Sequence, residues 1–157
     1  MEKSLKEYLK KIQFQYTLHK HPAVFHVSES KDLKKDIPGM HTKSLFLRDK
    51  EGNYYLVCMR GEKRLDMKHL ESLLQVKKLT FASPEELKSE LNLTPGSVSI
   101  FGILHAHHTQ LIIDKELWEA ERVNFHPNIN TETLEFTHEH LETFYNSLRT
   151  KKEILDL

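Results

Sequence analysis

Two apolar, β-rich runs on either side of a short turn are the strongest constraint on how this 157-residue chain can fold. The runs cover residues 43–48 and 53–59, and residues 49–53 between them are charged and include a glycine. Runs of this composition around such a turn predict an antiparallel hairpin. The chain must then contain a sheet with at least one antiparallel pair of strands.

Helical and β-type patterns alternate irregularly around this hairpin. Helix starts are predicted, from capping residues ahead of apolar residues at helical spacing, at Ser4, Ser28, Asp66, Ser83 and Thr137. Further strand candidates or short apolar runs are residues 16–19, 98–104, 111–113, 123–125 and 134–136. This order predicts a mixed α/β fold, with a mixed sheet packed against helices, and it is not a regular βαβ repeat. One domain over residues 1–157 is the simplest organisation.

The charge balance limits the kinds of partner. Lys plus Arg and Asp plus Glu number 23 each, so the net charge is zero with histidine neutral. A histone-like binder that depends on a large positive field is therefore excluded, whereas a local basic patch is not. Lys43, Arg60, Lys63 and Arg64 are candidates for such a patch, although the last three equally suit a solvated turn.

Cysteine content and hydropathy predict a cytoplasmic protein. The single cysteine, Cys58, allows no intramolecular disulfide and no Cys-x-x-Cys zinc site, which suits a reducing compartment. The charged N-terminus argues against a signal peptide, and the apolar runs are far shorter than a membrane span. Cys58 itself lies inside an apolar run, where a small core residue is expected rather than a nucleophile.

Two residues stand out as candidates for binding chemistry. Lys43 begins an apolar strand, from which it can reach into a cleft as a point charge on a phosphate; an ordinary strand-edge lysine is the alternative. His126 precedes Pro127, which restricts its backbone and so fixes the direction of the imidazole. That suits a binding role, and a structural histidine fits the same pattern.

Metal chemistry has only one candidate motif. His105 and His107 would share one side of a strand, next to His108, but a metal site needs further ligands that the pattern does not supply. A polar loop is therefore the preferred interpretation. No phosphate loop, Gly-x-Gly-x-x-Gly motif or nucleophile elbow is present, so neither a metal nor a cofactor is expected.

Four short blocks of the chain resemble blocks of one protein family, in its order and spacing. Residues 42–49 (Thr-Lys-Ser-Leu-Phe-Leu-Arg-Asp) resemble the family's Thr-Lys-Asn-Leu-Phe-Leu-x-Asp, and residues 95–102 (Pro-Gly-Ser-Val-Ser-Ile-Phe-Gly) resemble its Pro-Gly-Ser-Val-Ser-Pro-Phe-Gly. Residues 21–30 and 125–133 resemble its His-x-Pro-Val-Phe-Thr-x-x-Glu-Ala and Phe-His-Pro-x-x-Asn-Thr-x-Thr. The family is the YbaK and prolyl-tRNA synthetase editing-domain group, and the chain is most similar to its freestanding Ala-tRNA(Pro) deacylases.

The resemblance implies a central, barrel-like mixed sheet surrounded by helices and hydrolysis of the ester that joins a wrong amino acid to tRNA. It implies that Lys43 holds the phosphate of the terminal adenosine, that the loop at Gly96 lies beside the aminoacyl group, and that His126 lies near the amino acid. Residues expected to line the substrate are Phe25, Ser44, Ser97, Val98, Ile100 and Pro127.

Two departures from the family pattern concern the substrate. Ser44 replaces asparagine, which removes an amide, and Ile100 replaces a proline that would fix φ. Alanine is the expected amino acid, with serine or another small residue as alternatives. The expected partner is the aminoacyl end of tRNA(Pro), bound by a monomer, with prolyl-tRNA synthetase or an elongation factor as possible docking partners and with no membrane or DNA. A non-catalytic module that binds the aminoacyl-tRNA 3′ end is the alternative function, and a histidine-rich metal protein is the third.

Overall fold

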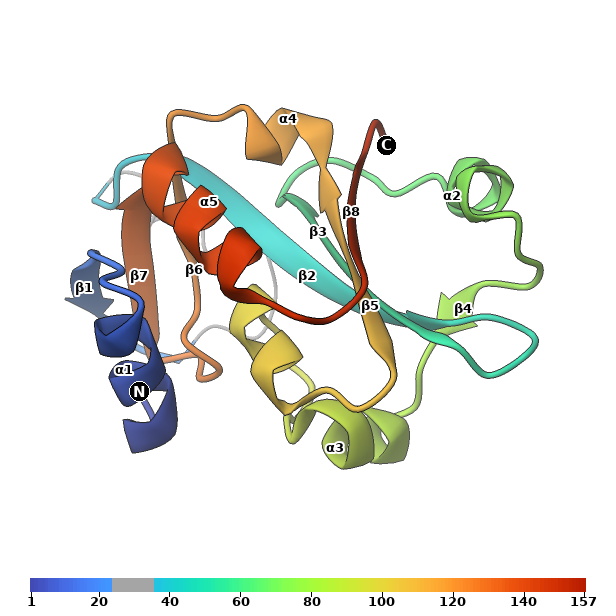
Figure 1. The fold of residues 1–157 in the computed structure, drawn as a ribbon, viewed down its shortest axis with the longest axis horizontal. Helices are drawn as coiled ribbons and strands as arrows, with labels where there is room; N and C mark the ends of the chain where they lie inside the picture. Colours follow the sequence, from blue (N-terminus) through green and yellow to red (C-terminus); the bar gives the residue numbers. More distant parts are fainter. Residues whose placement is uncertain (24–35) are drawn as a thin grey trace.

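The computed structural model describes residues 1–23 and 36–157, and its centre is a mixed β-sheet (Figure 1). The paired strands follow one another in the order β1 (Thr17–Lys20), β7 (Glu132–Thr137), β6 (Arg122–Phe125), β2 (Met40–Arg48), β3 (Tyr54–Arg60), β5 (Thr109–Asp114) and β8 (Lys152–Leu155). The short strand β4 (Thr80–Phe81) pairs with β2. Antiparallel and parallel pairs are mixed along this path, as predicted.

The sheet is open, so the prediction of a barrel-like closure is wrong. Strands β1 and β8 are the two edges, and no pairing between them is present in the described part of the chain. The reason lies in β2, which joins two groups of strands. It pairs with β6 only at Met40 and His41 but with β3 over Thr42–Arg48. Strands β6, β7 and β1 therefore form one wing, which β2 connects to the rest of the sheet.

The predicted hairpin is confirmed, with Ser44 opposite Cys58 in the β2–β3 register. Asp49 holds its turn together: its carboxylate accepts the Asn53 backbone N–H at 2.9 Å and the Tyr55 hydroxyl at 2.7 Å. Cys58 is completely buried, and this burial raises the pKa of its thiol to about 12. Such a thiol is unreactive, as expected of a core residue.

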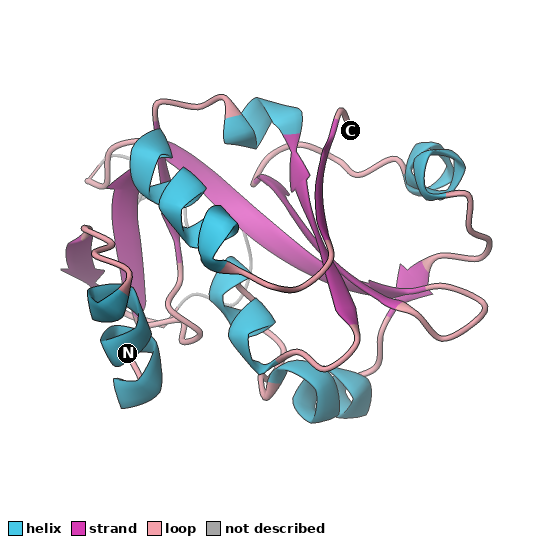
Figure 2. Cartoon of the chain, in the orientation of Figure 1, coloured by secondary structure: helices cyan, strands magenta, loops and turns pink. Residues whose placement is uncertain are grey.

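Helices cover both faces of the sheet (Figure 2). They are α1 (Lys3–Lys11), α2 (Met67–Leu74), α3 (Pro84–Leu91), the 3₁₀ helix η3 (Ile100–His105), α4 (Lys115–Trp118) and α5 (His138–Ser147). Core residues of α1, α5 and η3 pack with Phe46, Leu56 and Cys58 on one face. Leu70 of α2 packs with residues of the opposite face. None of the helices in the described ranges is long and apolar enough to cross a membrane.

The helix starts were predicted with mixed success. Asp66 caps α2, and Ser83 forms a capping box with Glu86 at α3, as the sequence indicates. The start at Ser4 is wrong in detail, because α1 begins at Lys3 and has no side-chain cap. Thr137 precedes α5, but its side chain makes no capping hydrogen bond. The helix expected at Ser28 lies outside the described residues.

The apolar segment 98–104 forms η3 rather than a strand. Ser99 explains the difference, since its hydroxyl accepts the Phe101 N–H at 3.0 Å and so begins a helical turn. The apolar residues that follow are buried because η3 lies inside the core. A continuous apolar run does not by itself distinguish a buried strand from a buried helix.

A buried carboxylate on α3, that of Glu90, holds the loop before β5 in place. One oxygen of Glu90 accepts hydrogen bonds from the backbone N–H groups of His107 and His108 and, at 2.9 Å, from the Thr109 hydroxyl. Burial alone would raise the pKa of Glu90, but these hydrogen bonds outweigh it and hold the pKa below its usual value of 4.5. The ionised carboxylate thus fastens the loop before β5 to α3.

Glu90→Gln is expected to lower the free energy of unfolding at pH 7 by about 1–3 kcal/mol, because charged acceptors make stronger hydrogen bonds than amides. Since the folded state binds this proton less readily than the unfolded state, the contribution disappears as pH falls through the lowered pKa. Urea unfolding at pH 7 and at acid pH would measure this, with exposed Glu51→Gln as the control. An equal loss at both pH values would contradict the role of the charge.

Candidate functional site

The wing formed by β1, β7, β6 and the start of β2 carries polar side chains on one face. Side chains alternate along a strand. The side chain of Lys43 is therefore on the other side of β2 from those of Ser44 and Phe46, which face the core. Val123 and Phe125 of β6 face the core, so Asn124 shares the outer face, where the register pairs it with His41. We call this surface the polar face; its members are His19, His41, Lys43, Arg122, Asn124, Thr133 and Glu135.

Lys43 lies on this face, and no described carboxylate is close to it. Burial, and to a lesser degree the charge of Arg60, lowers its pKa from the ordinary lysine value. Among the described residues, no carboxylate lies within ion-pair distance of Lys43, whereas Arg60 binds Glu116 and Lys63 binds Asp114, each at 2.8 Å. Of these three cations, Lys43 is the one whose charge remains available for an external anion such as a phosphate.

His126 follows β6 directly, and its ring has a defined tautomer. Its Nδ1 lies 2.9 Å from the Glu132 carbonyl oxygen, which can only accept, so Nδ1 carries the proton. Burial lowers the pKa of His126 from 6.5, the Glu132 carbonyl opposes this, and the neighbouring His21 adds to it. The ring is therefore neutral at pH 7, and Nε2 is a hydrogen-bond acceptor.

His21, which follows β1, and residues of β7 surround this histidine. The His21 ring lies 5.9 Å from that of His126, between centroids, and its Nε2 is 2.8 Å from the Thr133 hydroxyl. Glu135 bonds His19 at 2.8 Å and Arg122 at 2.7 Å, and it is buried. The polar face is thus held by hydrogen bonds that extend across three strands.

The loop before η3 approaches the same region. Gly96 has a φ of 89°, a left-handed conformation that favours glycine, and the Ser97 N–H donates to the Thr94 carbonyl at 3.1 Å. The Ser99 hydroxyl donates to Asn128 Oδ1 at 3.2 Å, which ties this loop to the segment after His126. The β2–β6 pairing brings the start of β2 to β6 and its following segment. The fold therefore gathers the elements that carry Lys43, Gly96 and His126.

The residues expected to line the substrate do not all lie on the polar face. Ser44 lies on the core side of β2, where its hydroxyl is 3.4 Å from the Cys58 sulfur, so it does not share the face of Lys43. The Ile100 side chain is completely buried in the core, which leaves only its backbone for a substrate. Pro127 is buried, Ser97 and Val98 are partly exposed, and Phe25 lies outside the described residues.

The other members of the polar face were missed by the sequence analysis. They are His19, His41, Arg122, Asn124, Thr133 and Glu135. A usable signal was present in two of these segments, because polar and apolar residues alternate in 122–126 and in 133–135, whereas 19–21 and 41–43 are polar throughout. That period-two pattern is typical of a strand with one polar face.

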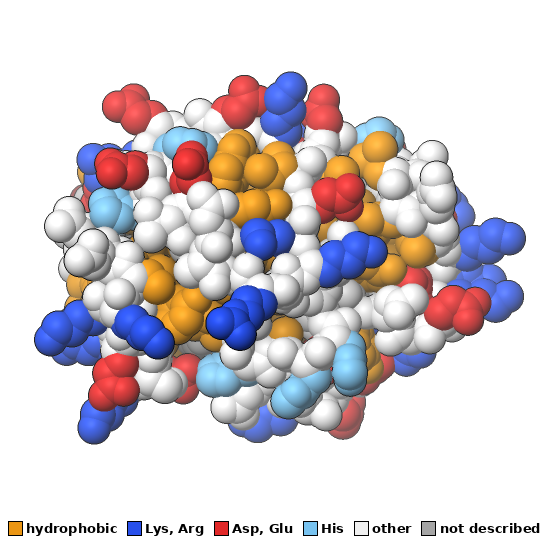
Figure 3. Space-filling view, in the orientation of Figure 1, with side chains coloured by type: hydrophobic (Ala, Val, Ile, Leu, Met, Phe, Trp, Pro, Cys, Tyr) orange, Lys and Arg blue, Asp and Glu red, His pale blue; other side chains and the backbone are white. Residues whose placement is uncertain are grey.

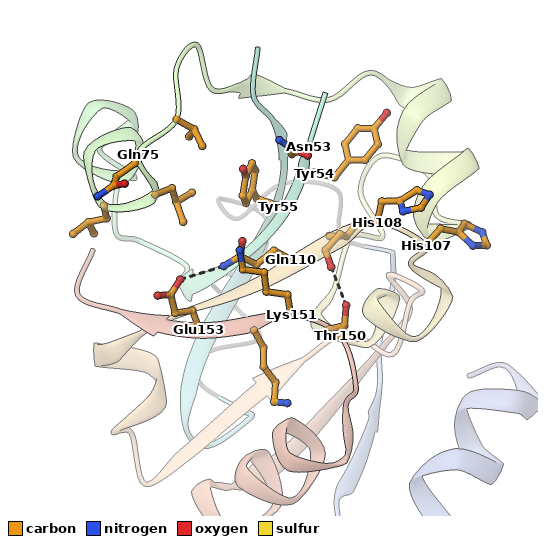
Figure 4. Close-up of a pocket in the computed structure, with 15 residues that line it drawn as sticks. Asn53, Tyr54, Tyr55, Gln75, His107, His108, Gln110, Thr150, Lys151 and Glu153 are labelled. Atoms are coloured by element: carbon orange, nitrogen blue, oxygen red, sulfur yellow. Dashed lines mark hydrogen bonds between the residues drawn. The ribbon is translucent and has the colours of Figure 1, made fainter. Parts of the chain in front are cut away.

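A separate groove of about 940 Å³ lies at the other end of the sheet (Figure 4). Its walls come from the starts of β3 and β5, the end of α2 and residues 150–153, and Figure 4 shows Gln110 bonded to Glu153 across it. Lys43, Gly96 and His126 do not line this groove. It is therefore distinct from the site built on the polar face.

The histidines of residues 105–108 do not form a metal centre. His105 bonds Glu2 at 2.8 Å, while His107 and His108 are exposed. Within residues 1–23 and 36–157, no group of three or more His, Cys, Asp or Glu side chains could hold a metal ion. Positive and negative side chains are also interspersed over the face shown in Figure 3, in keeping with the zero net charge.

Comparisons with known proteins show what the chain is similar to. Residues 21–144 match the family model of the aminoacyl-tRNA editing domain. The chain is 34% identical, over 85% of its length and 84% of the relative's, to the prolyl-tRNA editing protein ProX of Acetoanaerobium sticklandii. It is 29% identical to prolyl-tRNA synthetase associated domain-containing protein 1 of Danio rerio, covering 87% of this chain and 77% of that one.

The fold has solved counterparts as well. The crystal structure of a candidate trans-editing enzyme for prolyl-tRNA synthetase superposes with a TM-score of 0.77 at 21% identity, over 100% of this chain and 98% of that one. At this identity the likeness concerns the fold alone. The family match covers most of the sequence, including all of the polar face except His19. The chain therefore belongs to the aminoacyl-tRNA editing domain family.

Proposed function

We propose that this protein is a trans-editing deacylase that hydrolyses mischarged aminoacyl-tRNA, with Ala-tRNA(Pro) as its substrate. Family membership supports the reaction class, and a relative named as a prolyl-tRNA editing protein, 34% identical over most of both chains, supports tRNA(Pro) as the carrier. Alanine is the finer part of the proposal, and it rests on the sequence blocks shared with the Ala-tRNA(Pro) deacylases.

One observation carries the proposal: a lysine with no ion-pair partner among the described residues and a neutral histidine acceptor belong to the same wing of the sheet. Lys43 supplies a positive charge for the phosphate of the terminal adenosine. His126 presents Nε2 to the amino acid, where it accepts a hydrogen bond from the α-amino group directly or through water. Together they hold the two ends of an aminoacyl-adenosine.

The chemistry needs little more than correct positioning. An aminoacyl ester is already activated, so hydrolysis requires a placed water and a stabilised oxyanion rather than a covalent nucleophile. Backbone N–H groups of the loop at Gly96 can approach the ester because glycine has no side chain there. The ribose hydroxyl of the substrate helps to place the water.

The preference for a small amino acid follows from size. A closed pocket excludes proline by steric overlap, but it rejects smaller residues weakly, because each lost methylene contact is worth only about 1–3 kcal/mol. Alanine, serine and cysteine are therefore the relevant competitors.

A deacylation panel tests the proposal. We expect Ala-tRNA(Pro) to be hydrolysed faster than Ser- or Cys-tRNA(Pro), and Pro-tRNA(Pro) to be spared. Rates would be measured with tRNA(Pro) charged with each amino acid and compared with the spontaneous rate. Saturable binding of aminoacyl-tRNA without turnover of any of them would contradict the enzyme and favour the non-catalytic binding module. Faster turnover of Ser-tRNA(Pro) would overturn only the choice of alanine.

A further inference from the structure

Asn128 has an unusual combination of properties for a residue so close to the site. Its side chain is only 8% exposed, and its φ of 65° is left-handed, which asparagine tolerates better than most residues. Oδ1 accepts a hydrogen bond from the Ser99 hydroxyl at 3.2 Å. Nδ2 is buried and has no hydrogen-bond partner within residues 1–23 and 36–157.

A buried amide donor without a partner lowers stability, and folded proteins contain few of them. The cap of η3 does not require Asn128, because the Ser99 hydroxyl accepts the Phe101 N–H directly. Glycine would satisfy the left-handed backbone without the buried donor. The asparagine therefore carries a cost in stability at this position, which points to a role in function.

The position of Asn128 indicates what that role is. It lies two residues after His126, and its partner Ser99 lies three residues after Gly96. The Ser99–Asn128 hydrogen bond joins these segments at side chains that are both buried. A shift of one segment relative to the other would change the distance between the loop N–H groups and the imidazole, and misplacement of reacting groups is costly.

We infer that Asn128 is a positioning residue, which fastens the loop at Gly96 to the segment that carries His126. The inference rests on the proposed deacylase function. The hydrogen bond from Ser99 to Oδ1 sets the spacing of the two segments. Because Asn128 acts through this bond and touches no reacting atom, its loss affects turnover more than the folding of the chain.

The test compares Asn128→Gly, Asn128→Asp, Ser99→Ala and the Asn128→Gly/Ser99→Ala double variant on Ala-tRNA(Pro). For Asn128→Gly we expect kcat to fall about fivefold to tenfold, the loss of one neutral hydrogen bond, with KM within about twofold. Asn128→Asp keeps an acceptor for Ser99 and is expected to recover most of kcat. Asn92→Gly is the matched control, since Asn92 is exposed and also left-handed, with a φ of 57°.

The remaining outcomes separate the inference from its alternatives. The double variant should lose no more kcat than the worse single variant, because both changes remove the same bond; additive losses would overturn the inference. Wild-type kcat in folded Asn128→Gly, or an Asp variant as slow as the Gly variant, would overturn it as well. Urea unfolding shows which variants fold, and Ser99→Ala tests the same bond from the other side. A wild-type protein that hydrolyses no aminoacyl-tRNA would instead refute the proposed function.

Discussion

Lys43→Ala is expected to reduce kcat/KM for Ala-tRNA(Pro) by about 10- to 100-fold, which corresponds to the loss of a charge-assisted hydrogen bond to phosphate. Two features of the site make this loss large. Lys43 is partly buried on the polar face, where water screens a charge less than at the surface, and no described carboxylate competes for it. Single-turnover deacylation over a range of enzyme concentrations would measure the effect.

Lys115→Ala is the control for the loss of one positive charge. Lys115 is exposed on α4, and Glu119, at 3.9 Å, is the one described carboxylate with which it forms an ion pair. Its removal therefore changes the net charge equally but leaves the polar face intact. Lys43→Arg should recover part of the activity, because it keeps the charge but replaces a compact ammonium with a planar group. If Lys43→Ala and Lys115→Ala reduce kcat/KM equally, Lys43 does not anchor the phosphate.

The pKa of Lys43 adds a pH dependence to this prediction. Because its pKa is lowered, the folded protein loses this charge at a lower pH than an ordinary lysine would. Substrate binding should therefore weaken with rising pH before 10.5, and the Ala variant should lack this alkaline change. The fluorescence of labelled tRNA would report binding directly, without reference to turnover.

The sequence predicted the elements of the fold better than their arrangement. The hairpin, the capping box at Ser83 and the cap at Asp66 depend on neighbouring residues, and all three are confirmed. Barrel-like closure depends on how far β2 pairs with β6, a contact between residues more than 80 positions apart. No local sequence pattern determines a contact between residues so far apart along the chain.

The residues of the candidate site were likewise easier to predict than their arrangement. Lys43 and His126 could be selected from the sequence because each stands in a distinctive block. Ser44 follows Lys43 directly, yet the alternation of β2 places it on the other side of the sheet. Asn128 was missed because its importance lies in a buried amide and a bond to Ser99, which is 29 positions away. Residues that are adjacent in the sequence can therefore lie on different sides of the sheet, and residues that act together can be far apart in the sequence.

His126→Asn should fold normally but reduce kcat/KM for Ala-tRNA(Pro) by about 10- to 100-fold. The asparagine amide nitrogen takes approximately the place of Nδ1, so the hydrogen bond to the Glu132 carbonyl can persist. Nothing replaces Nε2, and the acceptor for the α-amino group is lost. His69→Asn is the matched control, because His69 also bonds a backbone carbonyl, that of Asp156 at 2.9 Å, but lies exposed on α2.

The pH profile identifies which ring state acts. In the wild type, kcat/KM should fall as the pH drops below 6.5 through the lowered pKa of His126, because a protonated ring has no acceptor and repels an α-ammonium group. The same pKa shift makes folding less favourable in acid, since the unfolded histidine binds its proton more readily than the folded one. Rates must therefore be taken where circular dichroism shows the folded state. If the acid limb remains unchanged in His126→Asn, another group governs it and His126 is not the acceptor.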